Sequence, residues 1–258
     1  QMSKYTYFAD QVLTKTAKAR EDEDLKQWYM TDGSPERGLC QLDHSDACIW
    51  LIICCIEIIR LSHNDSLFGS LEPYADSQQE ETVLEHLRKA AYYMTSQTGA
   101  HGLCLMKDGD WTDPINGPGR NGRGESVWNT MALVYAISLL CSIREDETLL
   151  RMQRQLTEAL NQHCWDEDRY IVAFDDEGLP VGSRADQEGA LFLNTQTWAL
   201  ISGVCQSERV QTLRATLRTL KTDCGYLLLY PPFSSWNPQW GKISVKYIGN
   251  TENGSVYS

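Results

Sequence analysis

The sequence lacks an apolar run long enough to cross a lipid bilayer, and it lacks an excess of basic residues. Its most apolar stretch, CIWLIICCIEII, is interrupted by Glu57, whereas a membrane-spanning helix needs roughly 20 apolar residues. The 258 residues carry 23 Lys and Arg against 35 Asp and Glu, which gives a formal net charge of −12. We therefore expect neither a membrane protein nor one whose main partner is nucleic acid or an anionic membrane surface.

Metal-binding and disulfide patterns are missing as well. The 9 cysteines are an odd number without a CxxC pair, several lie in apolar runs, and the 5 histidines show no ligand spacing. Such cysteines behave as small buried hydrophobic residues of a protein in a reducing compartment. The chain does not open with a signal peptide. We expect a cytoplasmic protein without a metal site.

What the sequence does contain is helical periodicity. Helices are predicted for segments 46–61, 80–96, 125–143, 146–164, 195–206 and 208–222. Apolar and polar helices alternate among them, as expected where inner helices are covered on both sides and outer helices face water. A short strand is predicted at 169–174, and an extended run at 226–233 ends in two prolines. The simplest fold is one all-α domain with long, structured loops.

The stretch MKDGDWTDPINGPGRNGRGESVW combines acids, one tryptophan and a glycine-rich loop. Asp108, Asp110 and Asp113 surround Trp111. A phosphate-binding loop is disfavoured, because Gly124 is followed by Glu-Ser instead of Lys-Ser or Lys-Thr. An ordinary glycine-rich loop entering a helix is the simple alternative. A tryptophan beside a carboxylate favours sugar chemistry, in which the indole stacks on a pyranose ring and an acid in a dry site protonates the glycosidic oxygen.

Several blocks of the sequence resemble one enzyme family. GDWTDPINGPGRNGRGESVW resembles the Gly-Asp-Trp-Asn-Asp signature and the following Gly-rich, Gly-Glu-Ser-Val-Trp segment of the inverting glycoside phosphorylases of glycoside hydrolase family 94. That family includes cellobiose, chitobiose and cellodextrin phosphorylases and the phosphorylase-like part of cyclic β-1,2-glucan synthases. Further blocks resemble family segments in the same order, namely HSDACIWL, CWDEDRYIVAFDDEGLPVGS, GALFLNTQTWALISGV, GYLLLYPPF and GNTENGSVY.

This resemblance implies a fold and a reaction. The fold is a partial (α/α)6 barrel with short β segments in its loops. The reaction is reversible phosphorolysis of a β-linked gluco-oligosaccharide or disaccharide. Asp113 is the general acid that protonates the bridging oxygen, while inorganic phosphate attacks the anomeric carbon from the opposite face. The configuration inverts, and the product is an α-sugar 1-phosphate. Trp111 lines the site of the transferred sugar, and Glu252 lies near the acceptor sugar. Phosphate is the co-substrate, and no other cofactor is implied.

The resemblance also implies what residues 1–258 leave out. In the family a phosphate-binding His follows the Glu-Asn-Gly-x-Val-Tyr motif, while the donor-sugar Arg and Asp and a β-sandwich domain come before the matching region. We expect an incomplete catalytic domain, truncated at both ends and inactive alone, from a full-length protein that could form a homodimer. Thr112 replaces the commoner Asn of the signature. Thr251 stands where cellobiose phosphorylases tend to have Lys, so strict cellobiose specificity is not expected.

Other polar residues near these motifs have alternative roles. Asp46 is either the N-cap of its helix or a residue of the site. Gln196 could hydrogen-bond a sugar hydroxyl, whereas Asn194 is a plausible N-cap. Arg123 could pair with a carboxylate. Glu125 is expected to favour the helix dipole or to hold Arg123 rather than to touch substrate.

The remaining expectations concern aromatic residues and the choice of reaction. Trp50 is expected in the core, and Trp236 and Trp240 either stack on the acceptor sugar or pack their loop. Asp110 is expected to support Asp113. The alternative activity is an inverting hydrolase on the same barrel, in which water replaces phosphate and Glu252 is the only candidate base. A non-catalytic sugar-binding remnant is the third possibility.

Overall fold

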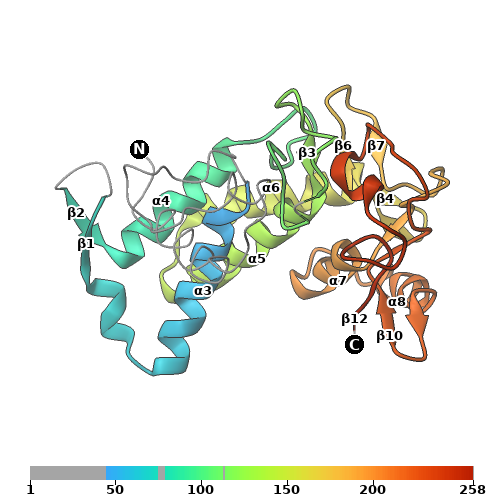
Figure 1. The fold of residues 1–258 in the computed structure, drawn as a ribbon. Helices are drawn as coiled ribbons and strands as arrows, with labels where there is room; N and C mark the ends of the chain where they lie inside the picture. Colours follow the sequence, from blue (N-terminus) through green and yellow to red (C-terminus); the bar gives the residue numbers. More distant parts are fainter. Residues whose placement is uncertain (1–44, 75–78, 113, 258) are drawn as a thin grey trace, which may run out of the picture.

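The computed structural model describes residues 45–74, 79–112 and 114–257. Helices dominate this part of the chain, as the sequence predicts, and short strands lie in the loops between them (Figure 1). The α-helices are α3 (Ala47–Ser62), α4 (Val83–Ser96), α5 (Val127–Ile143), α6 (Glu147–His163), α7 (Leu193–Ile201) and α8 (Val210–Arg218). The 3-10 helix η2 (Asp65–Gly69) follows α3, and η3 (Gly241–Val245) lies in the C-terminal part.

The strands are short and all pair antiparallel. The pairs are β1 (Leu71–Pro73) with β2 (Glu80–Thr82), β4 (Trp165–Asp166) with β5 (Arg169–Tyr170), and β8 (Leu191–Phe192) with β11 (Leu229–Tyr230). One three-stranded sheet has the strand order β3 (Glu125–Ser126), β6 (Ala173–Phe174), β7 (Pro180–Val181). A second three-stranded sheet has the strand order β12 (Val256–Tyr257), β10 (Gly225–Leu227), β9 (Lys221–Thr222).

Several predicted elements differ from the structure, and the helices predicted at 195–206 and 208–222 end early, at Ile201 and Arg218. The single strand predicted at 169–174 is wrong, because β5 pairs with β4 whereas β6 lies between β3 and β7. The helix predicted from residue 80 begins at Val83, because residues 80–82 form β2 and the Thr82 hydroxyl accepts the Glu85 N–H as an N-cap. Whether such short segments form strands depends on their cross-strand partners, which for β6 include the distant β3.

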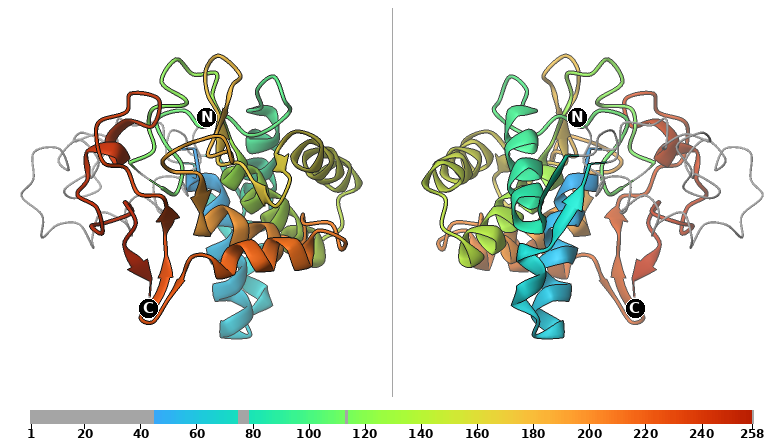
Figure 2. Two further views of the ribbon diagram at one scale, coloured as in Figure 1. Left: turned by 90° about the vertical axis from the view of Figure 1, so that its right-hand side faces the viewer. Right: turned by 90° about the vertical axis from the view of Figure 1, so that its left-hand side faces the viewer.

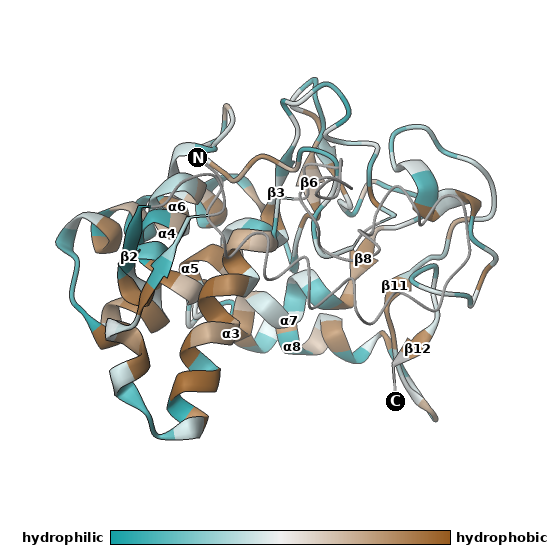
Figure 3. Cartoon of the chain, turned by 60° about the vertical axis from the view of Figure 1, so that its left-hand side comes forward, coloured by the Kyte–Doolittle hydropathy of each residue, from teal (hydrophilic) through white to brown (hydrophobic). Residues whose placement is uncertain are grey.

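Helix α5 is the centre of the helical part. It packs against α3, α4, α6 and α7, and it is apolar nearly all round, so that most of its residues are buried. Helix α3 is likewise apolar along most of its length (Figure 3). Helices α6 and α8 bury only one stripe each. The contrast between well-covered α3 and α5 and water-facing α6 and α8 agrees with the predicted alternation for these four helices.

One tryptophan from each of three apolar helices meets the other two. Trp50 of α3, Trp128 of α5 and Trp198 of α7 have ring centroids 5.3–6.0 Å apart, a range typical of favourable aromatic pairs. Trp128 is 1% exposed. Trp50 packs against the main core, which confirms its expected place. This aromatic cluster fixes the relative positions of α3, α5 and α7.

A second apolar cluster lies beneath the loops. It contains Met106, Ile115, Val172, Ala173, Val181, Phe192, Leu229, Phe233, Trp240 and Ile243. Most of these residues come from the short strands and the C-terminal part. Seen from both sides, that C-terminal part lies across the molecule from α6 (Figure 2). The loops are therefore a packed layer in their own right, which positions the site described next.

Candidate active site

A pocket of about 460 Å³ lies where three stretches of the chain meet. The first stretch precedes Asp113, the second spans β8 and the start of α7, and the third is C-terminal. The lining residues are Trp111, Thr112, Phe192, Asn194, Leu228, Thr251, Glu252, Ser255 and Val256. The volume suits a small organic ligand. The structure thus brings together three residues that the sequence predicts for sugar binding, Trp111, Thr251 and Glu252.

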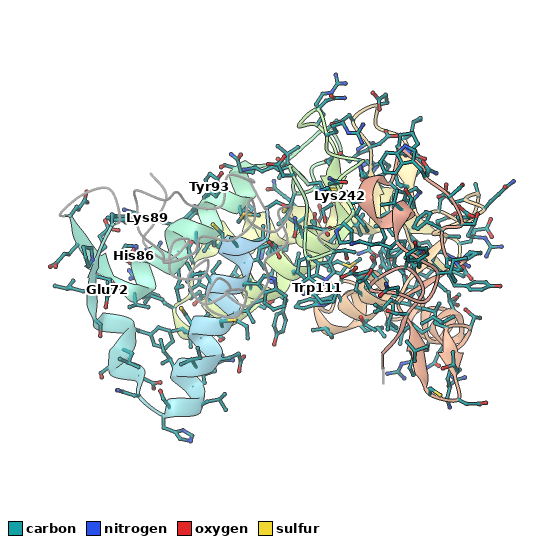
Figure 4. All side chains as sticks on the ribbon, viewed as in Figure 1. Glu72, His86, Lys89, Tyr93, Trp111 and Lys242 are labelled. Atoms are coloured by element: carbon teal, nitrogen blue, oxygen red, sulfur yellow. The ribbon has the colours of Figure 1, made fainter. Side chains whose placement is uncertain are left out.

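Trp111 extends the aromatic cluster into the pocket. Its ring is stacked on Trp128 with centroids 5.9 Å apart and planes at 25°. The side chain is still 37% exposed, although one face of the indole lies against Trp128. Figure 4 shows Trp111 near the middle of the molecule, between the helices and the C-terminal part. An aromatic ring held in this way is a suitable platform for a pyranose ring.

The predicted general acid, Asp113, lies outside the described residues, but the backbone on each side of it is tethered. The carbonyl of Thr112 accepts the N–H of Ile115 at 2.8 Å. The carbonyl of Pro114 accepts the N–H of Ile243 in η3 at 2.8 Å. The loop is therefore attached to η3, in the C-terminal part of the chain, immediately after position 113.

Asp110 anchors the other side of this loop. It is 2% exposed, and its carboxylate accepts the Thr112 N–H at 2.9 Å and the Ser126 hydroxyl at 2.5 Å. Burial raises the pKa of Asp110, against the opposing effect of these two hydrogen bonds. Ser126 is also the N-cap of α5, since its hydroxyl accepts the Asn129 N–H. Asp110 thus joins the loop to the start of the central helix.

Ser45 and Asn129 form a second anchor that the sequence analysis missed. The Ser45 hydroxyl lies 2.9 Å from the carbonyl oxygens of both Met106 and Gly109. The Asn129 side-chain amide donates to the Ser45 hydroxyl at 2.5 Å. Both residues are buried. The only available signal was that Ser126 and Asn129 have the spacing of an N-cap and its partner, which does not reveal the tertiary contact.

The glycine-rich loop is held by an acid from a distant turn. The Asp176 carboxylate accepts the backbone N–H groups of Asn121, Arg123 and Gly124 at 2.7, 2.8 and 3.0 Å. A Cβ at Gly124 would collide with the backbone of Pro118, so close backbone packing explains this glycine. Because these three N–H groups already bind a carboxylate, the geometry does not favour a phosphate cradle at this loop.

Arg123 and Glu125 of the predicted site do not line the pocket. Arg123 is exposed, and its backbone N–H donates to the Asp176 carboxylate as described above. Glu125 is 2% exposed, and its carboxylate accepts the N–H groups of His101 and Leu103, each at 3.0 Å. The His101 ring nitrogen Nδ1 lies 2.6 Å from the same carboxylate. Glu125 therefore holds the 101–103 turn, whereas the expected roles were to favour the helix dipole or to hold Arg123.

Gln196 has a structural position. It is 0% exposed, its side-chain oxygen accepts the Tyr170 N–H, and its side-chain nitrogen donates to the Tyr170 carbonyl, both at 2.8 Å. Both ends of the amide are thus occupied by β5, contrary to the expectation of a sugar contact. Asp46 is the N-cap residue of α3 but makes no side-chain cap hydrogen bond. Its carboxylate accepts the Trp50 indole N–H at 3.0 Å, and it is not among the pocket-lining residues.

Asn194 is a pocket residue that the sequence analysis assigned to a helix cap. The N-cap of α7 is Phe192, so that Asn194 lies in the first helical turn. Its side-chain oxygen accepts the Thr195 N–H at 2.8 Å, and its side-chain nitrogen donates to the Thr112 hydroxyl at 2.9 Å. Asn194 therefore links α7 to the residue immediately before Asp113.

The turn that carries Thr251 and Glu252 is fixed by Asn253. Asn253 is 0% exposed. Its side-chain nitrogen donates to the carbonyls of Phe233 and Lys246 at 2.9 and 2.7 Å, and its side-chain oxygen accepts the Phe233 N–H at 2.8 Å. Thr251 has a positive φ of 48°, which this buried network maintains. The Glu-Asn-Gly motif thus supplies both a pocket acid and the residue that positions it.

The two C-terminal tryptophans have different surroundings. Trp240 is 1% exposed and stacks on Phe192 with centroids 5.3 Å apart, so it packs its loop, which was one of the two expected roles. Trp236 is half exposed and is not among the pocket-lining residues. In the described part of the chain, no cluster of three or more metal-ligating side chains is found. Its helices are also too short or too polar to cross a membrane.

Comparison with known proteins identifies relatives of this chain. Residues 3–258 match the model of the glycosyl hydrolase 94 superfamily, catalytic domain. A 3-O-beta-D-glucopyranosyl-beta-D-glucuronide phosphorylase of Paenibacillus borealis is 51% identical over 240 residues, which cover 90% of this chain and 31% of that protein. A solabiose phosphorylase of the same species is 36% identical over 257 residues, which cover 95% of this chain and 33% of that protein.

One solved structure of a glycoside hydrolase has a fold similar to that of this chain. The family 78 glycoside hydrolase (rhamnosidase) of Bacillus sp. GL1 superposes with a TM-score of 0.55 at 16% identity, over 84% of this chain and 25% of that one. The chain spans about a third of the length of the two curated relatives. From the family match and these relatives, the chain belongs to the glycosyl hydrolase 94 superfamily, within its catalytic domain.

Proposed function

We propose that the protein containing this chain catalyses reversible phosphorolysis of a β-linked glucoside with inversion. The proposal rests mainly on the pocket, which Trp111, Thr251 and Glu252 line together beside the loop that contains Asp113. The relatives are phosphorylases of a glucosyl glucuronide and of solabiose. The residues that resemble the family's sugar-binding motifs are thus gathered at one cavity.

In the proposed reaction, Asp113 is the general acid. Its proton passes to the bridging oxygen as the glycosidic C–O bond breaks, and a phosphate oxygen forms the new bond to the anomeric carbon from the opposite face. The products are the free acceptor sugar and an α-sugar 1-phosphate. No general base is needed, because phosphate is already a nucleophile. Inorganic phosphate is the co-substrate, and no other cofactor takes part.

The pocket residues take complementary roles in this proposal. Trp111 is the platform for the transferred sugar, and Asp110 holds the loop that carries the acid. Glu252 and Thr251 face the acceptor sugar. The first of the two relatives acts on a glucuronide, and Thr251 is not the Lys typical of cellobiose phosphorylases, so we propose an acceptor other than glucose.

We also propose that α3 to α8 are part of an (α/α)6 barrel. Three apolar helices, α3, α5 and α7, meet at the tryptophan cluster. The more polar helices α4, α6 and α8 each follow one of them in sequence, and α6 and α8 bury only one stripe each. An inner ring alternating with an outer ring produces this order. In this proposal, residues 1–258 belong to one incomplete catalytic domain. We separately propose that the enzyme is cytoplasmic.

Phosphate dependence tests the proposed function. The intact protein that carries this chain should release a sugar 1-phosphate from a β-glucoside only when phosphate is present. Release of free sugar at the same rate without phosphate would instead indicate the hydrolase, with Glu252 as base. Asp113→Asn should lower kcat by about 10²–10⁴-fold, the usual contribution of general acid catalysis. Full activity of this variant would refute the assignment of the acid.

A further inference from the structure

The hydrogen bond between Asn194 and Thr112 has a defined direction. The backbone N–H of Thr195 can only donate, so the Asn194 atom that faces it at 2.8 Å must be the side-chain oxygen. The side-chain nitrogen of Asn194 therefore faces the Thr112 oxygen at 2.9 Å. Since this nitrogen is a donor, the Thr112 oxygen accepts, and the hydroxyl hydrogen of Thr112 points elsewhere.

That hydroxyl hydrogen is available to a ligand. Thr112 lines the pocket, and no residue of the described part of the chain accepts a hydrogen bond from its hydroxyl. Thr112 is only 4% exposed, so an unused donor there would be costly unless a bound molecule supplies the acceptor. Its backbone is also held on both sides, by the Asp110 carboxylate at its N–H and by Ile115 at its carbonyl.

We infer that the Thr112 hydroxyl donates a hydrogen bond to an oxygen of the sugar bound over Trp111, and that Asn194 is the positioning residue that sets the direction of this donor. The inference rests on the proposed function for the identity of the ligand. A sugar is rich in hydroxyl and ring oxygens, which accept from such a donor. Thr112 and Trp111 are neighbours in sequence and both line the pocket, so a ring stacked on the indole lies within reach of the hydroxyl.

The inference separates two nearly isosteric changes by their chemistry. Thr112→Val removes the hydroxyl and keeps the shape. Asn194→Asp keeps an oxygen for the Thr195 N–H but presents a carboxylate oxygen to Thr112, so that the Thr112 hydroxyl turns and donates to it. Both variants remove the same donor from the pocket. Their effects on sugar recognition should therefore be equal and should not add in the double variant.

The test measures kcat/KM for phosphorolysis and, independently, sugar binding by isothermal titration calorimetry. In the intact protein, Thr112→Val and Asn194→Asp should each weaken both by about 10-fold, the usual size of one lost hydrogen bond, and the double variant should be no worse. Thr112→Ser should retain near wild-type values, because it keeps the hydroxyl. The matched controls are Thr157→Val on α6, whose hydroxyl donates to the Gln153 carbonyl, and Asn64→Asp, an exposed residue immediately before η2.

A deoxy-sugar series gives a readout that a purely structural role would not change. One analogue in the series lacks the sugar oxygen that accepts the hydrogen bond from Thr112. For that analogue, wild type and Thr112→Val should have equal affinity. The inference is overturned if Thr112→Val matches wild type, if Thr112→Ser is as impaired as Thr112→Val, or if the two single effects add. If the protein binds sugar but forms no sugar phosphate, the proposed reaction fails while the binding data still decide the role of Thr112. If it binds no sugar at all, both ideas are refuted.

Discussion

The Asp176 carboxylate allows a quantitative test of how the glycine-rich loop is held. It is 7% exposed and accepts three backbone N–H groups, those of Asn121, Arg123 and Gly124. Asp176→Ala removes all three acceptors. A hydrogen bond to a charged group contributes about 1.5–3 kcal/mol, but Asn121 and Arg123 are exposed, so water can replace part of the loss. We expect the free energy of unfolding to fall by about 2–4 kcal/mol.

Urea and thermal unfolding measure this loss. At about 2–4 °C per kcal/mol for a domain of this size, Tm should fall by roughly 5–15 °C. Asp176→Asn should lose less, because one oxygen can still accept from Arg123 and Gly124 while its amide nitrogen faces only the Asn121 N–H. The control is Asp223→Ala, which removes an exposed acid. An unchanged Tm in Asp176→Ala would refute the idea that this carboxylate fixes the loop.

Phosphate binding supplies the second readout for the same variant. If the loop were a phosphate cradle, Asp176→Ala would free its N–H groups and tighten phosphate binding. If the loop is a structural part of the site, as its contacts indicate, the KM for phosphate should not fall. Stability and phosphate affinity measured on one variant therefore separate the two interpretations of the glycines.

Three further predictions concern individual side chains. Trp111→Ala should weaken sugar binding roughly 10-fold or more, with Trp111→Phe intermediate, as calorimetric titration would show; equal affinities would contradict the platform role. Gln196→Ala should lower the free energy of unfolding by about 2–4 kcal/mol and leave the KM for sugar unchanged, because the amide serves the buried Tyr170 backbone. The pKa of Asp110 is higher in the folded protein than in the unfolded chain, so the folded protein holds this proton more tightly. As the pH rises above the unfolded pKa of about 3.9, Asp110 therefore lowers the free energy of unfolding. Asp110→Asn should therefore lose less stability than wild type between about pH 4 and pH 7 in urea melts, and parallel losses would count against the buried acid as the cause.

The helices could be read from the sequence because their signals are local. Apolar periodicity places α3, α5 and α6 to within about two residues, the uncertainty normal for helix ends. Caps such as Ser126 and Asp146 lie next to the turns that they bind. The short strands were harder, because two-residue strands have no period of their own. The division of 169–174 between two sheets depends on residues near 125, 165 and 180.

The candidate site was only partly predictable. Trp111, Thr251 and Glu252 could be named because their motifs resemble a family, and the structure brings them to one pocket. Asn194 was missed because a polar residue at a helix start looks like a cap, and only the fold shows its contact with Thr112. Gln196 looked equally available for a sugar, but burial against β5 occupies both ends of its amide. Spacing along the chain does not distinguish these two neighbouring amides.

The sequence by itself determined the mainly helical fold, the order of covered and exposed helices, and the motif in which an acid follows a tryptophan. These depend on periodicity and on residues a few positions apart, where chain connectivity already fixes the geometry. The tertiary structure decided which side chains face the pocket and which are occupied by backbone partners. It placed the Thr112 hydroxyl, the Asp176 carboxylate and the Asn253 amide by contacts between distant segments. Such contacts arise only when packing brings those segments together, so no local pattern encodes them.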